Sequence, residues 1–339
     1  MNKNAKRLLA NLSSCLFVGT LLAGAVQAHA TTLRLAHTFN PGEASYEVLA
    51  KLSKTVAEKS DGDLKIQVFP SEQLGSEVQL LQQAKNGSVD IVVPGYSGAS
   101  TLLPGLEISN APFMFKDWKE AKYVIESDAY QPMFDQLEKQ DNLIPLSKTW
   151  YWGWRNFTFK GHDVHSVADM KGLKVRVPES PIWVEMIKSF GASPAPIPFS
   201  EVYLALQQGT VDGQENPTPT IYSRKFYEVQ DELVVSHHML QSQVVLMNAQ
   251  RWKSLTDKER DILTQAFKDA AEENYQLQTS REDKMLDELK QGGKIKVVTD
   301  IDRDSFEKAA ASAREKLIDR WGSDNYQRVM QKIEAYRQQ

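Results

Sequence analysis

The feature that most constrains the fold is a regular alternation of strand-like and helix-like segments near the start of the chain. The strand-like segments are residues 33–37, 64–70 and 89–93, and the helix-like segments are residues 43–60 and 78–86. The strands alternate apolar and polar side chains, whereas the helices repeat apolar residues at helical intervals. Strands and helices in this order favour right-handed crossovers and a largely parallel sheet, so we predict an α/β fold.

A partial second copy of this pattern predicts two lobes. Residues 173–178 echo the strand at 64–70, and residues 200–212 echo the segment at 76–90. The echoes are short enough to arise by chance, but they favour two α/β lobes over one large sheet. Ligands of open α/β sheets bind beyond the carboxyl ends of the strands, so the site is expected in the cleft between the lobes. The predicted bounds are residues 31–153 with about 240–285 for the first lobe, and residues 154–239 with about 286–339 for the second.

A single helix of about 33 residues is predicted to cross both lobes. Thr256 and Glu259 have the spacing of a capping box, apolar residues continue at helical intervals to about Leu289, and two glycines follow at 292–293. At 1.5 Å per residue this helix measures about 50 Å, which is longer than one lobe is wide. A short strand at 295–298 and further helix complete the chain.

The first thirty residues have the pattern of a secretory signal peptide. Three basic residues stand at one end, an apolar stretch follows at 16–26, and Ala28-His29-Ala30 offers a small-x-small cleavage site. An amphipathic first helix is the weaker alternative, and lipid attachment at Cys15 is disfavoured because the apolar stretch follows this residue. Cys15 is the only cysteine, so a mature chain from Thr31 has no disulfide and no cysteine metal site. No later segment is apolar enough to span a membrane.

The sequence contains no recognisable catalytic or cofactor motif. No histidine stands in His-Glu-x-x-His spacing, and no nucleophile elbow or phosphate loop occurs. The pair His237-His238 is weak evidence for a metal on its own. A formal net charge of −4 without a basic patch argues against nucleic acid as a partner. We therefore expect a binding protein without cofactor or metal, and not an enzyme.

Two arginines inside predicted strands are candidates for binding an anion. Alternation along residues 150–155 places three tryptophans on one face of the strand and Arg155 on the other. Arg176 lies in the short strand that echoes the first lobe. A guanidinium can donate two parallel hydrogen bonds to a carboxylate, but an internal salt bridge explains each arginine equally well. Asn216 precedes a proline that holds its backbone extended, and its amide either binds a ligand or forms a plain Asx turn.

Four motifs in this order resemble the solute-binding proteins of tripartite ATP-independent periplasmic (TRAP) transporters, the DctP-like family. The motifs are residues 169–178, 198–207, 211–217 and 225–230. The resemblance implies two α/β lobes joined by hinge strands, a long helix that crosses both, and closure on a carboxylate. It also implies a periplasmic protein that delivers an organic acid to membrane permease subunits. By this resemblance Arg176 forms the main salt bridge to the carboxylate, Asn216 hydrogen-bonds it, Arg155 is a second positive group, and Phe199 lines the cleft.

The expected ligand is a sugar acid. Sialic-acid-binding members of the family carry an acidic residue where this chain has Gly95-Tyr96, so sialic acid is not expected. The aromatic residues at 150–154 suit a cyclic or polyhydroxy acid, which favours a hexuronate or aldonate, with a C4-dicarboxylate as the alternative. Candidates for contacting the ligand hydroxyls are His37, Tyr96, Glu77 and Gln79. We expect a monomer, and delivery to a signalling receptor instead of a permease is the remaining alternative.

Overall fold

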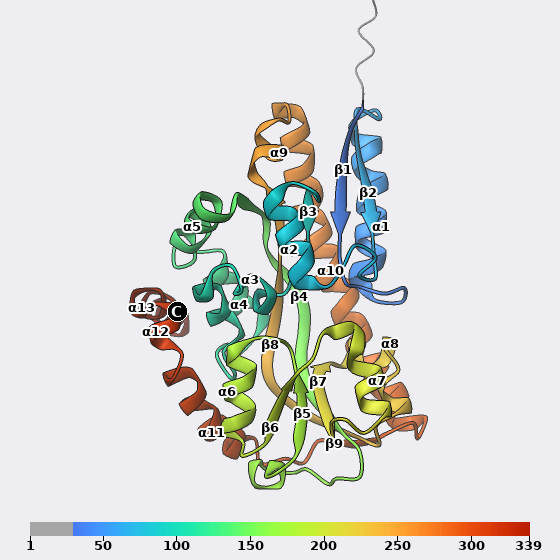
Figure 1. The fold of residues 1–339 in the computed structure, drawn as a ribbon, viewed down its shortest axis with the longest axis vertical. Helices are drawn as coiled ribbons and strands as arrows, with labels where there is room; N and C mark the ends of the chain where they lie inside the picture. The colour runs from blue at the N-terminus through green and yellow to red at the C-terminus, as the bar shows by residue number, and fades with distance from the viewer. Residues whose placement is uncertain (1–29) are drawn as a thin grey trace, which may run out of the picture.

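The computed structural model describes residues 30–339, which form two lobes stacked along the long axis of the molecule (Figure 1). Within these residues, nine strands form one mixed sheet in the order β2-β1-β3-β8-β4-β7-β5-β6, with β9 beside β8. The strands are β1 Thr31–Ala36, β2 Leu64–Phe69, β3 Ile91–Val92, β4 Leu143–Phe159, β5 Lys174–Val177, β6 Ser193–Pro196, β7 Gly213–Pro217, β8 Glu232–Asn248 and β9 Lys296–Val298. β1 pairs in parallel with β2 and β3, and β5 with β6 and β7. The predicted α/β fold is confirmed.

Helices separate the parallel strands of each lobe, as the alternation in the sequence predicts. The α-helices are α1 Ala44–Lys59, α2 Glu77–Asn86, α3 Tyr96–Ala99, α4 Trp118–Ile125, α5 Gln131–Asp141, α6 Pro181–Ser189, α7 Val202–Gln207, α8 Thr218–Ser223, α9 Ala249–Lys253, α10 Asp257–Gln291, α11 Arg303–Glu315, α12 Ile318–Trp321 and α13 Ser323–Arg337. The 3₁₀ segments are η1 Pro104–Asn110, η2 Val167–Met170, η3 Phe199–Glu201 and η4 Phe226–Glu228. α2 illustrates why these helices end where they do, because Gly87 adopts a φ of 81° that favours glycine and stops the helix.

Two long strands join the lobes. β4 and β8 contain 17 residues each and pair antiparallel along their length. β8 also pairs with β3 in the first lobe, and β4 pairs with β7 in the second. The two lobes therefore share one hydrogen-bonded sheet, because β4 and β8 run from one lobe into the other. These are the hinge strands that the family resemblance implies.

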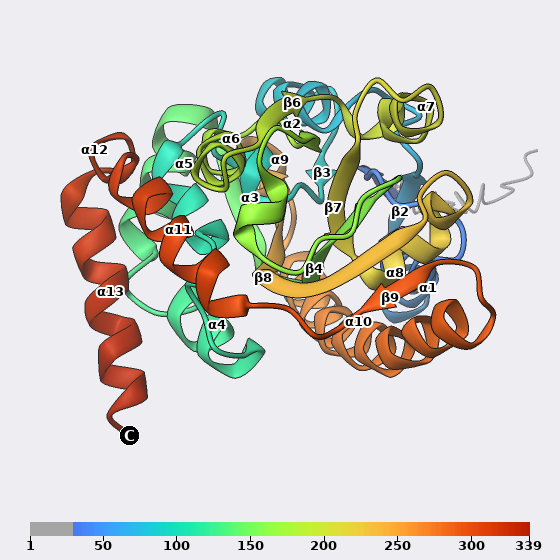
Figure 2. The same cartoon turned by 90° about the horizontal axis from the view of Figure 1, so that it is seen from below.

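The long helix α10 crosses both lobes, as predicted. Thr256 caps its first turn in a capping box with Glu259, and the helix ends at Gly292 after 35 residues. It packs on α1 and β4 of the first lobe and on α8 and β9 of the second (Figure 2). The amides of Asn274 and Gln278 donate to the carbonyl oxygens of Tyr151 and Trp152, at 2.7 and 2.8 Å. These bonds fasten α10 to the part of β4 that passes between the lobes.

The C-terminal helices lie against both lobes. α11 packs on α6, whereas α12 and α13 pack on η1 and α13 also packs on α4. The lobe bounds remain a prediction, but the segment from about residue 286 onward contacts more than the second lobe to which the sequence assigns it.

The predicted arrangement of the three tryptophans is wrong. Trp150 and Trp152 pack in the apolar cluster between β1, α1 and α10, but Trp154 packs in the other large cluster, which also contains Tyr151. The pairing of β4 with β8 shifts register between Tyr151 and Gly153, where Gly153 has a φ of 130°. A β-bulge at this point turns the following side chains over, so strict alternation fails.

The predicted signal peptide and Cys15 lie outside the residues that the structure describes. Within residues 30–339, none of the helices combines the length and the apolar composition that crossing a membrane requires.

Candidate ligand-binding site

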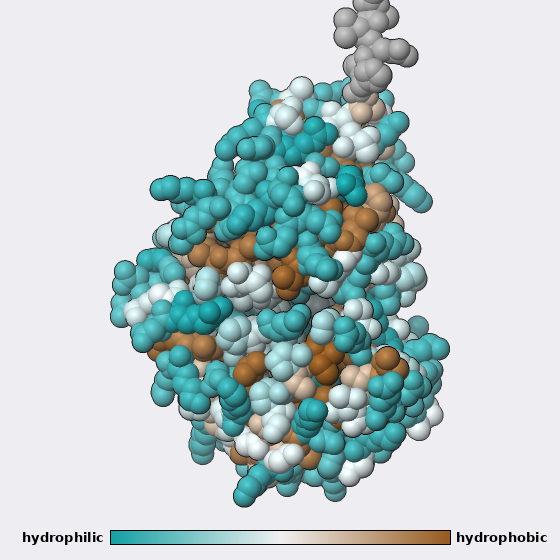
Figure 3. All heavy atoms as spheres, in the orientation of Figure 1, coloured by the Kyte–Doolittle hydropathy of each residue, from teal (hydrophilic) through white to brown (hydrophobic). Residues whose placement is uncertain are grey.

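Two adjoining hollows lie between the lobes, where apolar side chains gather on the surface while both ends of the molecule are mainly hydrophilic (Figure 3). Counting the part that is open to solvent, the space inside them is about 410 and 370 Å³. Both are lined by Glu77, Ser97, Arg176, Pro178 and Phe199. The hollows therefore form one continuous space with walls from both lobes, at the place where the sequence predicts the site.

Arg176 lies in the wall of both hollows. β5 carries its side chain inward, and the residue is only 2% exposed. Its Nε and Nη2 donate to the carbonyl oxygen of Ile197 at 2.9 and 2.7 Å. No carboxylate of residues 30–339 forms a salt bridge with it, and burial lowers the pKa of its guanidinium to about 10. The internal salt bridge that the sequence leaves open is thus not formed within these residues, and the buried guanidinium has no carboxylate at salt-bridge distance.

Arg155 has the opposite arrangement, although it lines the second hollow. Its Nη2 donates to Oε1 of Glu215 at 2.6 Å, its Nε also donates to this carboxylate, and its Nη1 donates to Gln241. His238 Nε2 lies 3.2 Å from the same carboxylate. Burial raises the pKa of Glu215, but the charge of Arg155 and the hydrogen bond with His238 outweigh it, and the pKa falls to about 2. For Arg155 the internal salt bridge is realised, and its role as a second ligand contact stays a prediction.

Asn216 and Phe199 line the site, as the resemblance implies. Asn216 lies in β7 and donates through Nδ2 to Gln214 Oε1 at 2.6 Å. Phe199 opens η3, and the centroid of its ring lies 5.7 Å from the guanidinium carbon of Arg176. The phenyl ring and the indole of Trp152 meet edge to face, with centroids 6.4 Å apart. The two aromatic rings give the cleft an apolar surface beside its cation.

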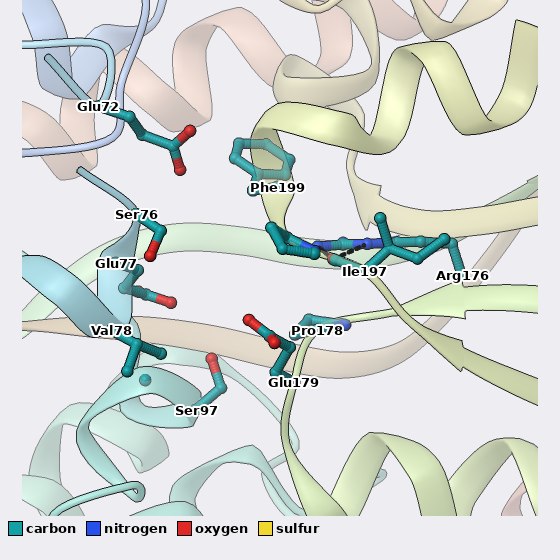
Figure 4. Close-up of a pocket in the computed structure, with 12 residues that line it drawn as sticks. Glu72, Ser76, Glu77, Val78, Ser97, Arg176, Pro178, Glu179, Ile197 and Phe199 are labelled. Carbon is teal, nitrogen blue, oxygen red and sulfur yellow. Dashed lines mark hydrogen bonds between the residues drawn. The ribbon is translucent and has the colours of Figure 1, made fainter.

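Three carboxylates face this surface. Glu72 and Glu77 approach from the first lobe, and Glu179 follows β5, with their oxygens directed into the space beside Arg176 and Phe199 (Figure 4). Glu77 accepts a hydrogen bond from the backbone N–H of Gly95, and burial raises its pKa to about 7. Burial also raises the pKa of Glu72. Of the three, only Glu77 is a candidate from the sequence. Glu72 lies just after the carboxyl end of β2. His37 was a candidate because it lies at the carboxyl end of a first-lobe strand, and the same criterion would have identified Glu72.

The structure does not bring His37, Tyr96 and Gln79 to the hollows. His37 is buried beside Phe39, its Nδ1 accepts from the Phe39 N–H, and burial lowers its pKa to about 3. The Tyr96 hydroxyl donates to the Lys148 carbonyl at 2.6 Å. Gln79 Oε1 accepts from the N–H of Ser76 in the capping box of α2. These hydrogen bonds lie inside the first lobe, although His37 Nε2 is buried without a partner among the described residues, and ligand contact by these three remains a prediction that this geometry does not favour.

No group of three or more histidine, cysteine, aspartate and glutamate side chains within residues 30–339 is placed to hold a metal ion. The site offers a guanidinium, an amide, hydroxyls, carboxylates and aromatic rings, which are groups that bind by hydrogen bonds, charge and contact.

Comparison with known proteins gives a consistent assignment. The family model described as bacterial extracellular solute-binding protein, family 7 (DctP), matches residues 35–320. The sialic acid-binding periplasmic protein SiaP of Vibrio cholerae is 36% identical over 274 residues, which cover 81% of this chain and 85% of that protein.

Two solved structures share the fold over most of both chains. The sugar acid binding protein DctPAm of Advenella mimigardefordensis, in complex with galactonate, has a TM-score of 0.86 and 28% identity, and the match covers 90% of this chain and 98% of that one. A TRAP solute-binding protein of Sulfurospirillum deleyianum with bound succinate has a TM-score of 0.82 and 28% identity, with 88% and 98% covered. The ligands of these three proteins differ, although each carries a carboxylate.

Proposed function

Because this chain belongs to the DctP family of bacterial extracellular solute-binding proteins, we propose that it captures a sugar acid, a hexuronate or an aldonate, between its lobes. As a member of the family it is a TRAP receptor for organic carboxylates, and not an enzyme. TRAP receptors deliver their acids to membrane permease components. The proposal concerns which carboxylate this receptor takes.

The observation that carries the proposal is the unpaired guanidinium of Arg176. Burying a cation without a salt-bridge partner is costly, and the lowered pKa of Arg176 reflects that cost. A ligand carboxylate would supply the missing negative charge, and the planar guanidinium suits it geometrically. Arg155 has its own carboxylate in Glu215, so it adds little net attraction for an anion.

The carboxylates of the site favour hydroxyl groups at the other end of the ligand. Glu72, Glu77 and Glu179 line the same hollow as Arg176, together with Ser76 and Ser97. Hydroxyls can donate hydrogen bonds to carboxylates, whereas a second ligand carboxylate would lie among like charges. A polyol chain also has an apolar C–H surface that can lie on the aromatic rings. This arrangement supports a sugar acid over the alternative, a C4-dicarboxylate.

Three six-carbon ligands with the same configuration at C2–C5 test the proposal directly. Galactonate has one carboxylate, galactitol has none, and galactarate has two. We would refold the protein to remove bound ligand and record thermal unfolding with each. A ligand at about 100 times its Kd adds roughly 2.7 kcal/mol to the free energy of unfolding, which raises the melting temperature by about 5 °C for a chain of this size.

The outcomes separate the parts of the proposal. A shift with galactonate or glucuronate, and none with galactitol, would support a carboxylate held by Arg176. A larger shift with succinate or galactarate would replace the sugar acid by a dicarboxylate. A shift with sialic acid alone would overturn our expectation from Gly95 and Tyr96. No shift with any acid of the panel would reject the proposed ligand class.

We also propose that residues 1–30 are removed on export and that the protein acts as a monomer without nucleic acid. The mass of the secreted protein and its elution in size-exclusion chromatography test these points. Genes for two membrane permease subunits beside its own would favour delivery to a permease over delivery to a signalling receptor.

A further inference from the structure

Arg224 bridges the two lobes at the edge of the ligand site. It directly follows α8 in the second lobe, and its guanidinium reaches the loop between β1 and α1 in the first. Its Nε donates to Glu43 Oε1 at 2.8 Å, and its Nη2 donates to the carbonyl oxygen of Thr38 at 2.7 Å. The hydroxyl of Ser223 donates to the same Glu43 oxygen at 3.2 Å. Opening the cleft would break all three bonds.

The partners of Arg224 in the first lobe are held in place. The second oxygen of Glu43 accepts from the backbone N–H of Asn40 at 3.1 Å, so the carboxylate is fixed before α1 begins. Thr38 lines the second hollow. The side chains of Arg224 and Glu43 are only 14% and 8% exposed, so solvent screens this ion pair much less than a surface pair.

Arg224 also touches the wall of the ligand site. Its guanidinium carbon lies 4.5 Å from the centroid of the Phe199 ring, which lines both hollows. Phe199 is therefore in contact with the cation that closes the cleft and with Arg176, the cation that faces the ligand. A guanidinium over an aromatic face is attractive, more so where water is excluded.

From these contacts we propose that Arg224 is a latch between the lobes, which holds Phe199 against the ligand and slows ligand release. The inference rests on the proposed function for its ligand, but it concerns a residue that does not itself reach the carboxylate. Arg224 is a positioning residue, since it acts through Phe199, Thr38 and Glu43. The lobes must part to release the ligand, so losing the latch should raise koff, and it should not slow binding.

The test compares Arg224→Gln with Arg281→Gln. Arg281 forms a pair with Glu47 at 2.7 and 3.0 Å, but that pair joins α10 to α1 at an exposed position away from the hollows. We expect Arg224→Gln to release galactonate about tenfold faster in stopped-flow measurements and to bind it no more slowly than wild type. Arg281→Gln should match wild type in both rates. Combining Arg224→Gln with Glu43→Gln should add little, because both remove the same interaction.

A second readout needs no ligand. With Cys15→Ser in every variant, Lys54→Cys on α1 and Gln208→Cys after α7 place two nitroxide labels at exposed positions on opposite lobes. We expect Arg224→Gln to shift the distance distribution to longer values and Arg281→Gln to leave it unchanged. Equal distances and equal release rates in Arg224→Gln and wild type would overturn the latch. If wild type fails to bind galactonate, the proposed ligand is wrong, and the distances still decide the latch.

Discussion

Replacing Arg176 by methionine should abolish ligand binding without destabilising the ligand-free protein. Burial lowers the pKa of Arg176 from 12.5 to about 10. At 1.36 kcal/mol per pKa unit, keeping the charge buried costs roughly 3 kcal/mol of folding free energy. This cost is present at every pH below about 10, and therefore at neutral pH. Methionine replaces the aliphatic stem of arginine and carries no charge, so it removes the cost.

The loss of the hydrogen bonds to Ile197 lowers the free energy of unfolding of the variant. These bonds contribute about 1–3 kcal/mol. Subtracting this loss from the cost that is removed, we expect the free energy of unfolding of ligand-free Arg176→Met to be unchanged or up to about 2 kcal/mol higher than that of wild type. The melting temperature should then rise by at most about 4 °C. Breaking a buried pair with the ligand carboxylate costs about 3–5 kcal/mol, so Kd should rise about 10²- to 10⁴-fold.

Thermal unfolding and calorimetric titration with galactonate measure both effects, with Arg281→Met as the control at a half-buried arginine outside the hollows. A variant that melts well below wild type without ligand would show that Arg176 is a structural residue whose charge is satisfied inside the protein. A variant that still binds galactonate as tightly as wild type would place the carboxylate elsewhere in the cleft.

Two further predictions concern buried carboxylates. Glu215→Gln removes the charge that Arg155 and His238 share, so we expect a loss of about 3–5 kcal/mol in urea unfolding at pH 7. Because the pKa of Glu215 is lowered to about 2, its stabilisation is complete above about pH 4.5 and lost as the pH falls towards 2, and the variant should lack this acid dependence. Glu77 should change stability with pH in the opposite direction to Glu215. Its pKa is raised to about 7, so its ionisation lowers the stability of the folded protein as the pH rises from 4.5 to 7. Glu77→Gln should therefore flatten stability over that range and weaken galactonate binding. Glu282→Gln, at another carboxylate with a pKa of about 7 but outside the hollows, should flatten stability without changing the affinity.

Local signals in the sequence predicted much of the fold because they act over short distances. The capping box of Thr256 and Glu259, the stop at Gly87 and the alternation of strands and helices each depend on neighbours along the chain. The bulge at Gly153 could not be predicted in this way, because it depends on how β4 pairs with β8, about ninety residues later in the sequence. This one irregularity reverses the face of Trp154 and places Trp152 near Arg155.

The same contrast between local sequence signals and long-range packing applies to the candidate site. The family motifs predicted Arg176, Asn216 and Phe199 as site residues; all three line the cleft, and their contact with a ligand stays a prediction. His37 and Tyr96 were chosen because they follow strands, yet the side chains turn into the first lobe, where backbone groups and aromatic rings are nearer than the cleft. Position at a strand end predicts the neighbourhood of a side chain, but packing decides its direction.

The difference between the arginines of the cleft explains how one of them can recognise an anion. Arg155 is paired with Glu215, and Arg224 with Glu43, so two of the three guanidinium charges are balanced from within residues 30–339. Only Arg176 among these three is left without a carboxylate partner in the described chain, and it faces a hollow that already holds three glutamates. A monocarboxylate would balance Arg176, whereas any further negative charge would meet the glutamates. Selectivity between sugar acids and dicarboxylates would then arise from where the counter-charges lie, and not from the number of arginines in the sequence.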